Sequence, residues 1–266
     1  MRKVFISCLG SVLIFMSKGM AVYLGNPATC ELPQEGVFLS GENKVALKVG
    51  YQTQSVLDRK MEVVLQPGFL GGCVDQIGMG FDQGVLVFNI IDRLEVVATL
   101  GSMRLSLDRT FTPNMQLTLE SHSSFVWSIG GQTMLILWDS TSLGVVANYL
   151  SSNPTPEIVL FNRKPYLKDK THISYDTWQI EVALSQKVDV FSVYLGAAYS
   201  YAQLKIVSDL FQKIGLDSIC EENYKNRHSL SMIMGVSLAA HKAFTMTFEA
   251  QAFGQTAIGM RMEFRF

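Results

Sequence analysis

Apolar and polar residues alternate along residues 243–266, the C-terminal end of the chain. Apolar residues take every second position from Phe244 to Ala252, with polar residues between them. The alternation resumes after Gly254 and continues to Phe266, the last residue. A period of two is typical of β-strands with one apolar and one polar face. The two segments are therefore predicted to form a terminal β-hairpin.

Similar alternating segments occupy most of the preceding chain. The clearest predicted strands are Asn43 to Tyr51, Gly84 to Gly101 with a turn inside it, Ser124 to Trp138, Trp178 to Leu184, Phe191 to Tyr201 and Ser229 to Ala240. Tight turns are predicted near residues 92, 140, 188 and 241, and longer loops at Asn162 to Ile173 and Ser208 to Arg227. Arg59 to Gln66 is a candidate partner of the first strand, and the glycine-rich stretch from Gly71 to Gly84 is left unassigned. Short turns at one end and long loops at the other are typical of outer-membrane β-barrels.

The composition supports a barrel that faces lipid. Hydrophobic residues make up 48% of the chain, and charged residues make up 17%, against roughly 25% in an average soluble protein. Beyond the N-terminus, no apolar run reaches the roughly 18 residues of a membrane helix. A closed barrel can expose apolar side chains to lipid because its backbone groups are all paired. We therefore predict an all-β, antiparallel transmembrane β-barrel of the outer membrane, with about 12–16 strands and an even number expected.

The N-terminus has the features of a signal peptide. Arg2 and Lys3 are followed by a short apolar stretch, Val4 to Met16, and Ala21 ends a small-residue cleavage site. The predicted organisation is a signal peptide at 1–21, an irregular N-terminal lead-in at 22–42 and a transmembrane β-barrel at 43–266. The lead-in is expected in the periplasm or against the inner end of the barrel. Export through a cleaved signal peptide places the protein in the cell outer membrane.

The charge balance and the cysteines restrict the partners. The formal net charge is −1, and removal of the basic residues of the signal peptide makes it −4, so no nucleic-acid partner is predicted. The mature chain keeps Cys30, Cys73 and Cys220, in an oxidising compartment. Because their number is odd, at least one is free or pairs between chains. A Cys73–Cys220 bond, an intermolecular bond through Cys30, and no stable disulfide all remain open.

Several segments, in order along the chain, resemble the chlamydial major outer membrane protein family. They are Leu24 to Ala28, Asn89 to Val96 with Thr99 to Gly101, Phe125 to Gly131 with Leu137-Trp138 and Leu143-Gly144, Trp178 to Ser185 with Val193 to Gly196, and Phe264 to Phe266. The resemblance covers residues 22–266 and implies a porin. This chain is shorter than the main family member, with the losses in the loops, and its three cysteines are few for the disulfide-linked envelope network of the family. By analogy with porins, the partners expected are outer-membrane lipid, small hydrophilic solutes and ions, and a homotrimer or disulfide-linked envelope partners.

A porin needs a polar, water-filled interior rather than a catalytic group. The predicted pore-lining residues are Lys48, Glu95, Glu181, Glu249, Arg261, Glu263 and Arg265. The alternative is that these side chains only solvate the inner wall or pair with one another. Small residues on the inner faces, Gly196, Ala198, Ser200 and Gly259, favour an open lumen. Phe244, Phe248, Met260 and Phe264 are predicted to face lipid.

No enzymatic activity, metal or cofactor is predicted. The four histidines, His122, His172, His228 and His241, are not spaced like zinc ligands. His122 lies among serines 121, 123 and 124, but adjacent strand residues point to opposite faces. The favoured function is passive diffusion of ions and small hydrophilic solutes. The alternative is a structural or adhesive surface protein with little conductance, and the width of the lumen decides between them.

Overall fold

The computed structural model describes residues 25–26, 45–64, 73–90, 93–112, 114–166, 171–209, 221–241 and 243–266. These residues form one sheet of fifteen strands, and its pairings are antiparallel throughout. In the described part of the chain, no helix is long and apolar enough to cross a membrane. The predicted signal peptide lies outside the described residues, as does the lead-in apart from residues 25–26.

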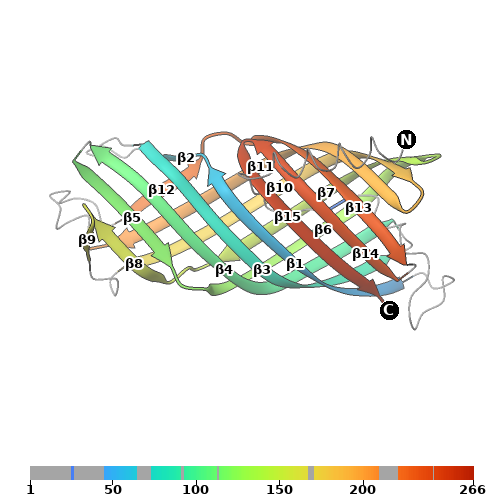
Figure 1. Ribbon diagram of the computed structural model, residues 1–266, viewed down its shortest axis with the longest axis horizontal. Helices are drawn as coiled ribbons and strands as arrows, with labels where there is room; N and C mark the ends of the chain where they lie inside the picture. Colours follow the sequence, from blue (N-terminus) through green and yellow to red (C-terminus); the bar gives the residue numbers. More distant parts are fainter. Residues whose placement is uncertain are drawn as a thin grey trace, which may run out of the picture.

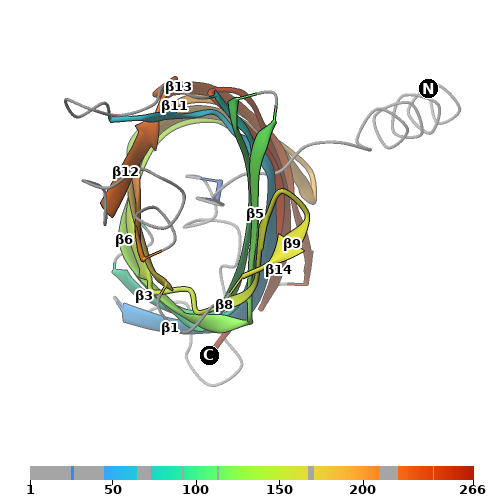
Figure 2. The same cartoon turned by 90° about the vertical axis from the view of Figure 1, so that its left-hand side faces the viewer.

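Ten strands close into a barrel (Figures 1 and 2). In the order of the ring they are β1 (Val45–Arg59), β3 (Cys73–Ile90), β4 (Leu94–Thr112), β6 (Ser124–Trp138), β7 (Thr141–Ser152), β10 (Thr171–Val188), β11 (Phe191–Ser208), β13 (Leu230–His241), β14 (Phe244–Phe253) and β15 (Gln255–Arg265). The last strand pairs with the first, Tyr51 opposite Met262. The predicted terminal hairpin is therefore both the end of the chain and the seam that closes the ring.

The prediction of 12–16 strands was wrong for the ring. It assumed about 10 residues per spanning strand, whereas β3, β4, β10 and β11 contain 18 or 19 residues each. These strands continue well beyond the length that a membrane requires. The chain therefore forms fewer and longer ring strands than predicted.

Four short connections and both ends of the barrel domain lie at one end of the ring, which we call the turn end. Asp139 and Asp189 occupy the left-handed region there, with φ of 54° and 57°. Aspartate is enriched in this conformation among residues other than glycine. At the opposite end, the loop end, the consecutive ring strands β14 and β15 are joined tightly through Gly254.

The longest strands project past the ring at the loop end and carry five short strands. β5 (Met115–Ser121), β8 (Pro156–Phe161) and β9 (Lys164–Pro165) extend from β4, and β12 (Glu221–Asn226) and β2 (Met61–Val63) extend from β11 (Figure 1). We call this part of the molecule the loop-end extension. β2 lies beside β3, and β8 lies beside β10, so the extension surrounds the same interior as the ring.

The loop-end extension corrects three predictions. Arg59 to Gln66 does not supply a ring partner for the first strand, because β2 pairs with β12. The unassigned stretch from Gly71 to Gly84 is largely the first half of β3. The predicted loop at Ser208 to Arg227 contains β12, while its residues 210–220 lie outside the described residues. β2 and β12 are distant in sequence, whereas the first half of β3 pairs with the neighbouring strands β1 and β4.

The outward side chains change from apolar to polar along the strands. On β11 they are mostly apolar from Phe191 to Tyr201 and polar at Gln203 and Lys205. This apolar length agrees with the roughly 9–11 residues of a tilted membrane-spanning strand. Trp178 stacks on Tyr201 with ring centroids 6.3 Å apart, near the polar boundary. We call the apolar outer zone the lipid band; Phe248 and Phe264 are exposed within it, as predicted.

The cysteine predictions are not tested. Cys73 is the first residue of β3, whereas Cys30 and Cys220 lie outside the described residues. The pairing therefore stays a prediction.

A charge in the lipid band is expected to destabilise the barrel. Val182 is 46% exposed and points outward in the apolar stretch of β10. We expect Val182→Arg to lower the free energy of folding into phosphocholine vesicles by about 2–4 kcal/mol, because it places a cation in hydrocarbon. Urea titration of the folded fraction measures this loss. His172→Arg, on the same face of β10 beyond the band, is the matched control, and an equal loss in both variants would contradict the position of the band.

Candidate functional site in the barrel interior

All seven predicted pore-lining residues lie on the inner wall of the ring. Their side chains are nearly inaccessible to solvent, between 0% for Lys48 and 5% for Arg261. They lie on β1, β4, β10, β14 and β15, in the half of the ring that carries the lipid band. The strands place them there because each belongs to the inward set of an alternating pattern.

An ion-pair network runs along the wall formed by β15, β1, β3, β4 and β6. Lys48 on β1 donates to the Glu95 carboxylate on β4, across the intervening β3. Asn89 donates to the same carboxylate at 2.7 Å, and Gln132 donates to its other oxygen. Glu263 on β15 lies 3.8 Å from the Lys48 ammonium and pairs with Arg261. Buried charges on β1, β4 and β15 therefore compensate one another, with neutral amide donors from β3 and β6.

A different set of contacts occupies the wall formed by β11, β13 and β14. The Tyr194 hydroxyl donates to Glu249 at 2.8 Å across Gly235 of the intervening strand. A Cβ at Gly235 would lie 2.3 Å from the Tyr194 ring, so this contact requires glycine. Both tyrosine and carboxylate are buried.

Residues 25–26 of the lead-in lie inside the barrel, against this wall. The Gly25 amide donates to Glu249 at 3.2 Å, and the Asn26 side-chain amide donates to Ser192 at 3.2 Å and Ser237 at 3.1 Å. Asn26 is completely buried. Figure 2 shows this short segment within the ring. These two residues of the lead-in therefore lie in the lumen.

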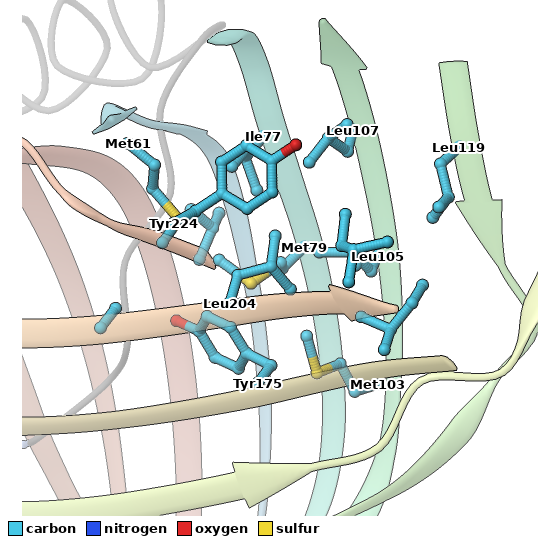
Figure 3. Packing of buried hydrophobic residues seen from close by; sticks show 14 of the residues in the cluster. Met61, Ile77, Met79, Met103, Leu105, Leu107, Leu119, Tyr175, Leu204 and Tyr224 are labelled. Carbon is cyan, nitrogen blue, oxygen red and sulfur yellow. The ribbon is translucent and has the colours of Figure 1, made fainter. Parts of the chain in front are cut away.

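The interior of the loop-end half is apolar and packed. We call the buried hydrophobic residues there the interior apolar cluster; it contains Val56, Met61, Ile77, Met79, Phe81, Met103, Leu105, Leu107, Phe111, Leu117, Leu119, Val126, Leu150, Val159, Ile173, Tyr175, Ala202, Leu204, Ile206 and Tyr224. Figure 3 shows part of this cluster, with side chains such as Met79 and Leu105 from the ring and Met61 and Tyr224 from the loop-end extension. The expectation of an open lumen, based on small inner residues, is wrong for this half. The small inner residues lie mainly in the half that carries the lipid band. Long inward side chains fill the loop-end half.

A signal for this cluster was present in the sequence and was missed. On β4, residues 94 to 100 alternate with the apolar side chains outward, whereas Met103, Leu105 and Leu107 are inward. Ser102, Arg104 and Ser106 take the outward positions there. The apolar face thus changes sides near Gly101, as it does near Gly84 of β3. Such a reversal indicates a strand that leaves lipid and begins to enclose a core.

Two arginines are buried at the edges of the interior apolar cluster. Arg109 pairs with Glu222, donates to the Tyr224 hydroxyl at 2.7 Å, and stacks over the Phe111 ring at 4.0 Å. Arg59 donates to the hydroxyl of Tyr175 and lies 3.4 Å from those of Thr177 and Ser200. These contacts tie β12 and β1 to the neighbouring walls. They reinforce closure of the loop-end half.

His122 and its neighbouring serines lie outside the lumen. A groove of about 670 Å³ on the outer face of the loop-end extension includes His122 and Glu157, whose side chains are 3.2 Å apart and half-exposed. The Ser124 hydroxyl donates to the His122 carbonyl, and the Ser121 hydroxyl accepts from the Leu105 amide. Both hydroxyls are thus engaged with the backbone rather than with the imidazole. Among the described residues there is also no group of three His, Cys, Asp or Glu side chains placed to hold a metal.

Known proteins related in sequence are porins. The major outer membrane porins of Chlamydia trachomatis serovars L1 and B are each 20% identical to this chain, over 97% of this chain and 99% of their own length. The chain is therefore similar to the chlamydial major outer membrane porins over nearly its whole length, at low identity. No family model matches it. The alignment spans 389 positions, so the relatives have segments that this 266-residue porin relative lacks.

Solved structures resemble this porin relative only distantly. The outer membrane protease OmpT of Escherichia coli has a TM-score of 0.43 at 11% identity, covering 83% of this chain and 97% of its own. Ail of Yersinia pestis has a TM-score of 0.35 at 9% identity, covering 84% of this chain and 97% of its own. Likenesses of this size carry no argument about activity. The sequence relationship and the barrel place the protein in the outer membrane, in contact with lipid.

Removal of Lys48 tests the ion-pair network. Lys48→Met leaves the buried Glu95 carboxylate with amide donors alone, so we expect a loss of about 3–5 kcal/mol in the free energy of unfolding. Adding Glu95→Gln removes the uncompensated charge and should restore most of that loss. Urea titration in detergent micelles measures both variants. A double variant no more stable than Lys48→Met would contradict the pairing.

Proposed function

We propose that this chain is a porin of low conductance that allows passive diffusion of ions and small hydrophilic solutes. The polar inner wall along the lipid-band half of the ring carries the proposal, because a lumen lined in this way favours hydrated solutes. The naming of the relatives as porins supports it. The seven predicted residues, from Lys48 to Arg265, are proposed to line this pathway. No catalytic step is part of this function.

The interior apolar cluster is proposed to restrict the pathway at the loop end. Hydrophobic constrictions exclude water and thereby limit ion passage. Phe81 and Met103 are cross-strand partners within the cluster, and at most 1% of either is exposed. Solute entry then requires rearrangement of packed side chains. A homotrimer and disulfide-linked envelope partners remain predictions from the porin analogy.

The second candidate is a structural or adhesive surface protein with little conductance. The observation that favours it is the near-complete burial of the inner side chains in both halves of the barrel. Purified protein in planar bilayers separates the two functions. Discrete current steps together with swelling of sugar-loaded liposomes support the porin, whereas a folded protein without either would favour the second candidate.

Trimming the interior apolar cluster should increase the current. We expect Phe81→Ala with Met103→Ala to raise single-channel conductance severalfold, because it removes side-chain volume at the restriction. Phe88→Ala, on the outward face of the same strand, is the control and should leave conductance unchanged. The cavity costs several kcal/mol of stability, about 3–5 for a buried phenylalanine alone, so Met103→Ala is also measured singly. Unchanged conductance in folded variants would contradict the restriction.

A further inference from the structure

Glu181 is a buried carboxylate whose charge is not matched by a contact with any described residue. It points inward from β10, with a relative exposure of 0%. Neither carboxylate oxygen has a hydrogen-bond partner among the described residues. An isolated buried carboxylate costs several kcal/mol. The other interior glutamates, such as Glu95 and Glu222, each have a basic partner or hydrogen-bond donors.

A bridge of three glutamines relates Glu181 to Glu249. The Gln255 amide donates to Gln179 at 3.4 Å and to Gln251 at 2.6 Å, and so connects β10 to β14 across the lumen. Glu181 follows Gln179 by two residues on the inner face of β10, and Glu249 precedes Gln251 by two on β14. Since β10 and β14 run in opposite directions, both carboxylates lie on the turn-end side of the bridge. A negative charge on Glu249 disfavours a negative charge on Glu181.

The surroundings supply oxygen atoms. The Gln255 carbonyl oxygen is buried and accepts no hydrogen bond from the described residues, while the amide nitrogen of that side chain makes both bridge contacts. Glu249 accepts from Tyr194 and from the Gly25 amide, which orient its carboxylate. Two carboxylates and a carbonyl oxygen are hard ligands. Such a group compensates its own repulsion by binding a hard cation.

We propose that Glu181 and Glu249, with the Gln255 carbonyl oxygen, bind a Ca²⁺ ion in the lumen beside the glutamine bridge. Ca²⁺ accepts an irregular set of six to eight oxygens, whereas Mg²⁺ demands near-octahedral geometry at short distances. Water completes the coordination. The ion neutralises the two carboxylates and links β10 to β14. Binding does not depend on conduction, so its failure is distinguishable from failure of the porin function.

Tb³⁺ luminescence tests the site in the full-length mature protein in detergent. The Tyr194 hydroxyl contacts Glu249, so excitation of tyrosine should sensitise Tb³⁺ bound there. We expect saturable emission that Ca²⁺ displaces and that equal concentrations of Mg²⁺ displace poorly. If the folded wild-type protein gave no sensitised emission, this measurement alone would contradict the proposed site.

Glu181→Gln should weaken Tb³⁺ binding at least ~10-fold, or ~1.4 kcal/mol. Glu157→Gln, in the exposed groove, is the control and should bind as the wild type does. With a chelator present, Glu181→Gln should be at least as stable as the wild type, since no contact is lost. Ca²⁺ should then raise the unfolding midpoint of the wild type alone. Equal Tb³⁺ affinity in the wild type and Glu181→Gln would place the ion elsewhere and contradict the proposal.

Discussion

The structure depends on one constraint, which is that backbone amides and carbonyls in hydrocarbon must find partners within the protein. An open sheet would leave two edges unpaired in lipid, so the first and last spanning strands must meet. The pairing of β1 with β15 meets this requirement. Once the ring is closed, strand alternation sends every second side chain to the lipid and the others to the interior. The remaining features of the molecule follow from what those interior side chains are.

The interior contains two different environments along one continuous wall. In the half that carries the lipid band, the inward side chains are largely polar and their charges compensate one another across several strands. In the loop-end half, the strands have left the lipid and their apolar side chains turn inward. The same strands therefore serve first as a membrane barrel and then as the shell of a hydrophobic core. Arg59 and Arg109 lie where these environments and the loop-end extension meet, held mainly by hydroxyl groups and by Glu222.

The barrel is similar in sequence to porins, but its interior differs from that of a wide channel. The relatives share nearly the full length of the chain at low identity, and their additional segments are absent here. A ring of ten strands encloses less space than a larger barrel. The long inward side chains of Ile77, Phe81 and Leu105 fill much of it. This filling of the lumen is the reason that low conductance is part of the proposed function.

Local alternation determined the strands, the tight turns and the inward direction of all seven predicted interior residues. The fold class and the outer membrane location were predicted from alternation together with the composition, the signal-peptide pattern and the family resemblance. The bounds of β6, Ser124 to Trp138, were also predicted, although its alternation is regular only in the first half and the register shifts between Met134 and Ile136. Which of those side chains meet was not predictable, because Lys48 and Glu95 lie on strands separated by β3. The strand number, the pairing of β2 with β12 and the packing of the loop-end half depend on ring closure and on partners distant in sequence. Alternation indicates on which face of a strand a side chain lies. Only the closed barrel determines which side chains from other strands it contacts.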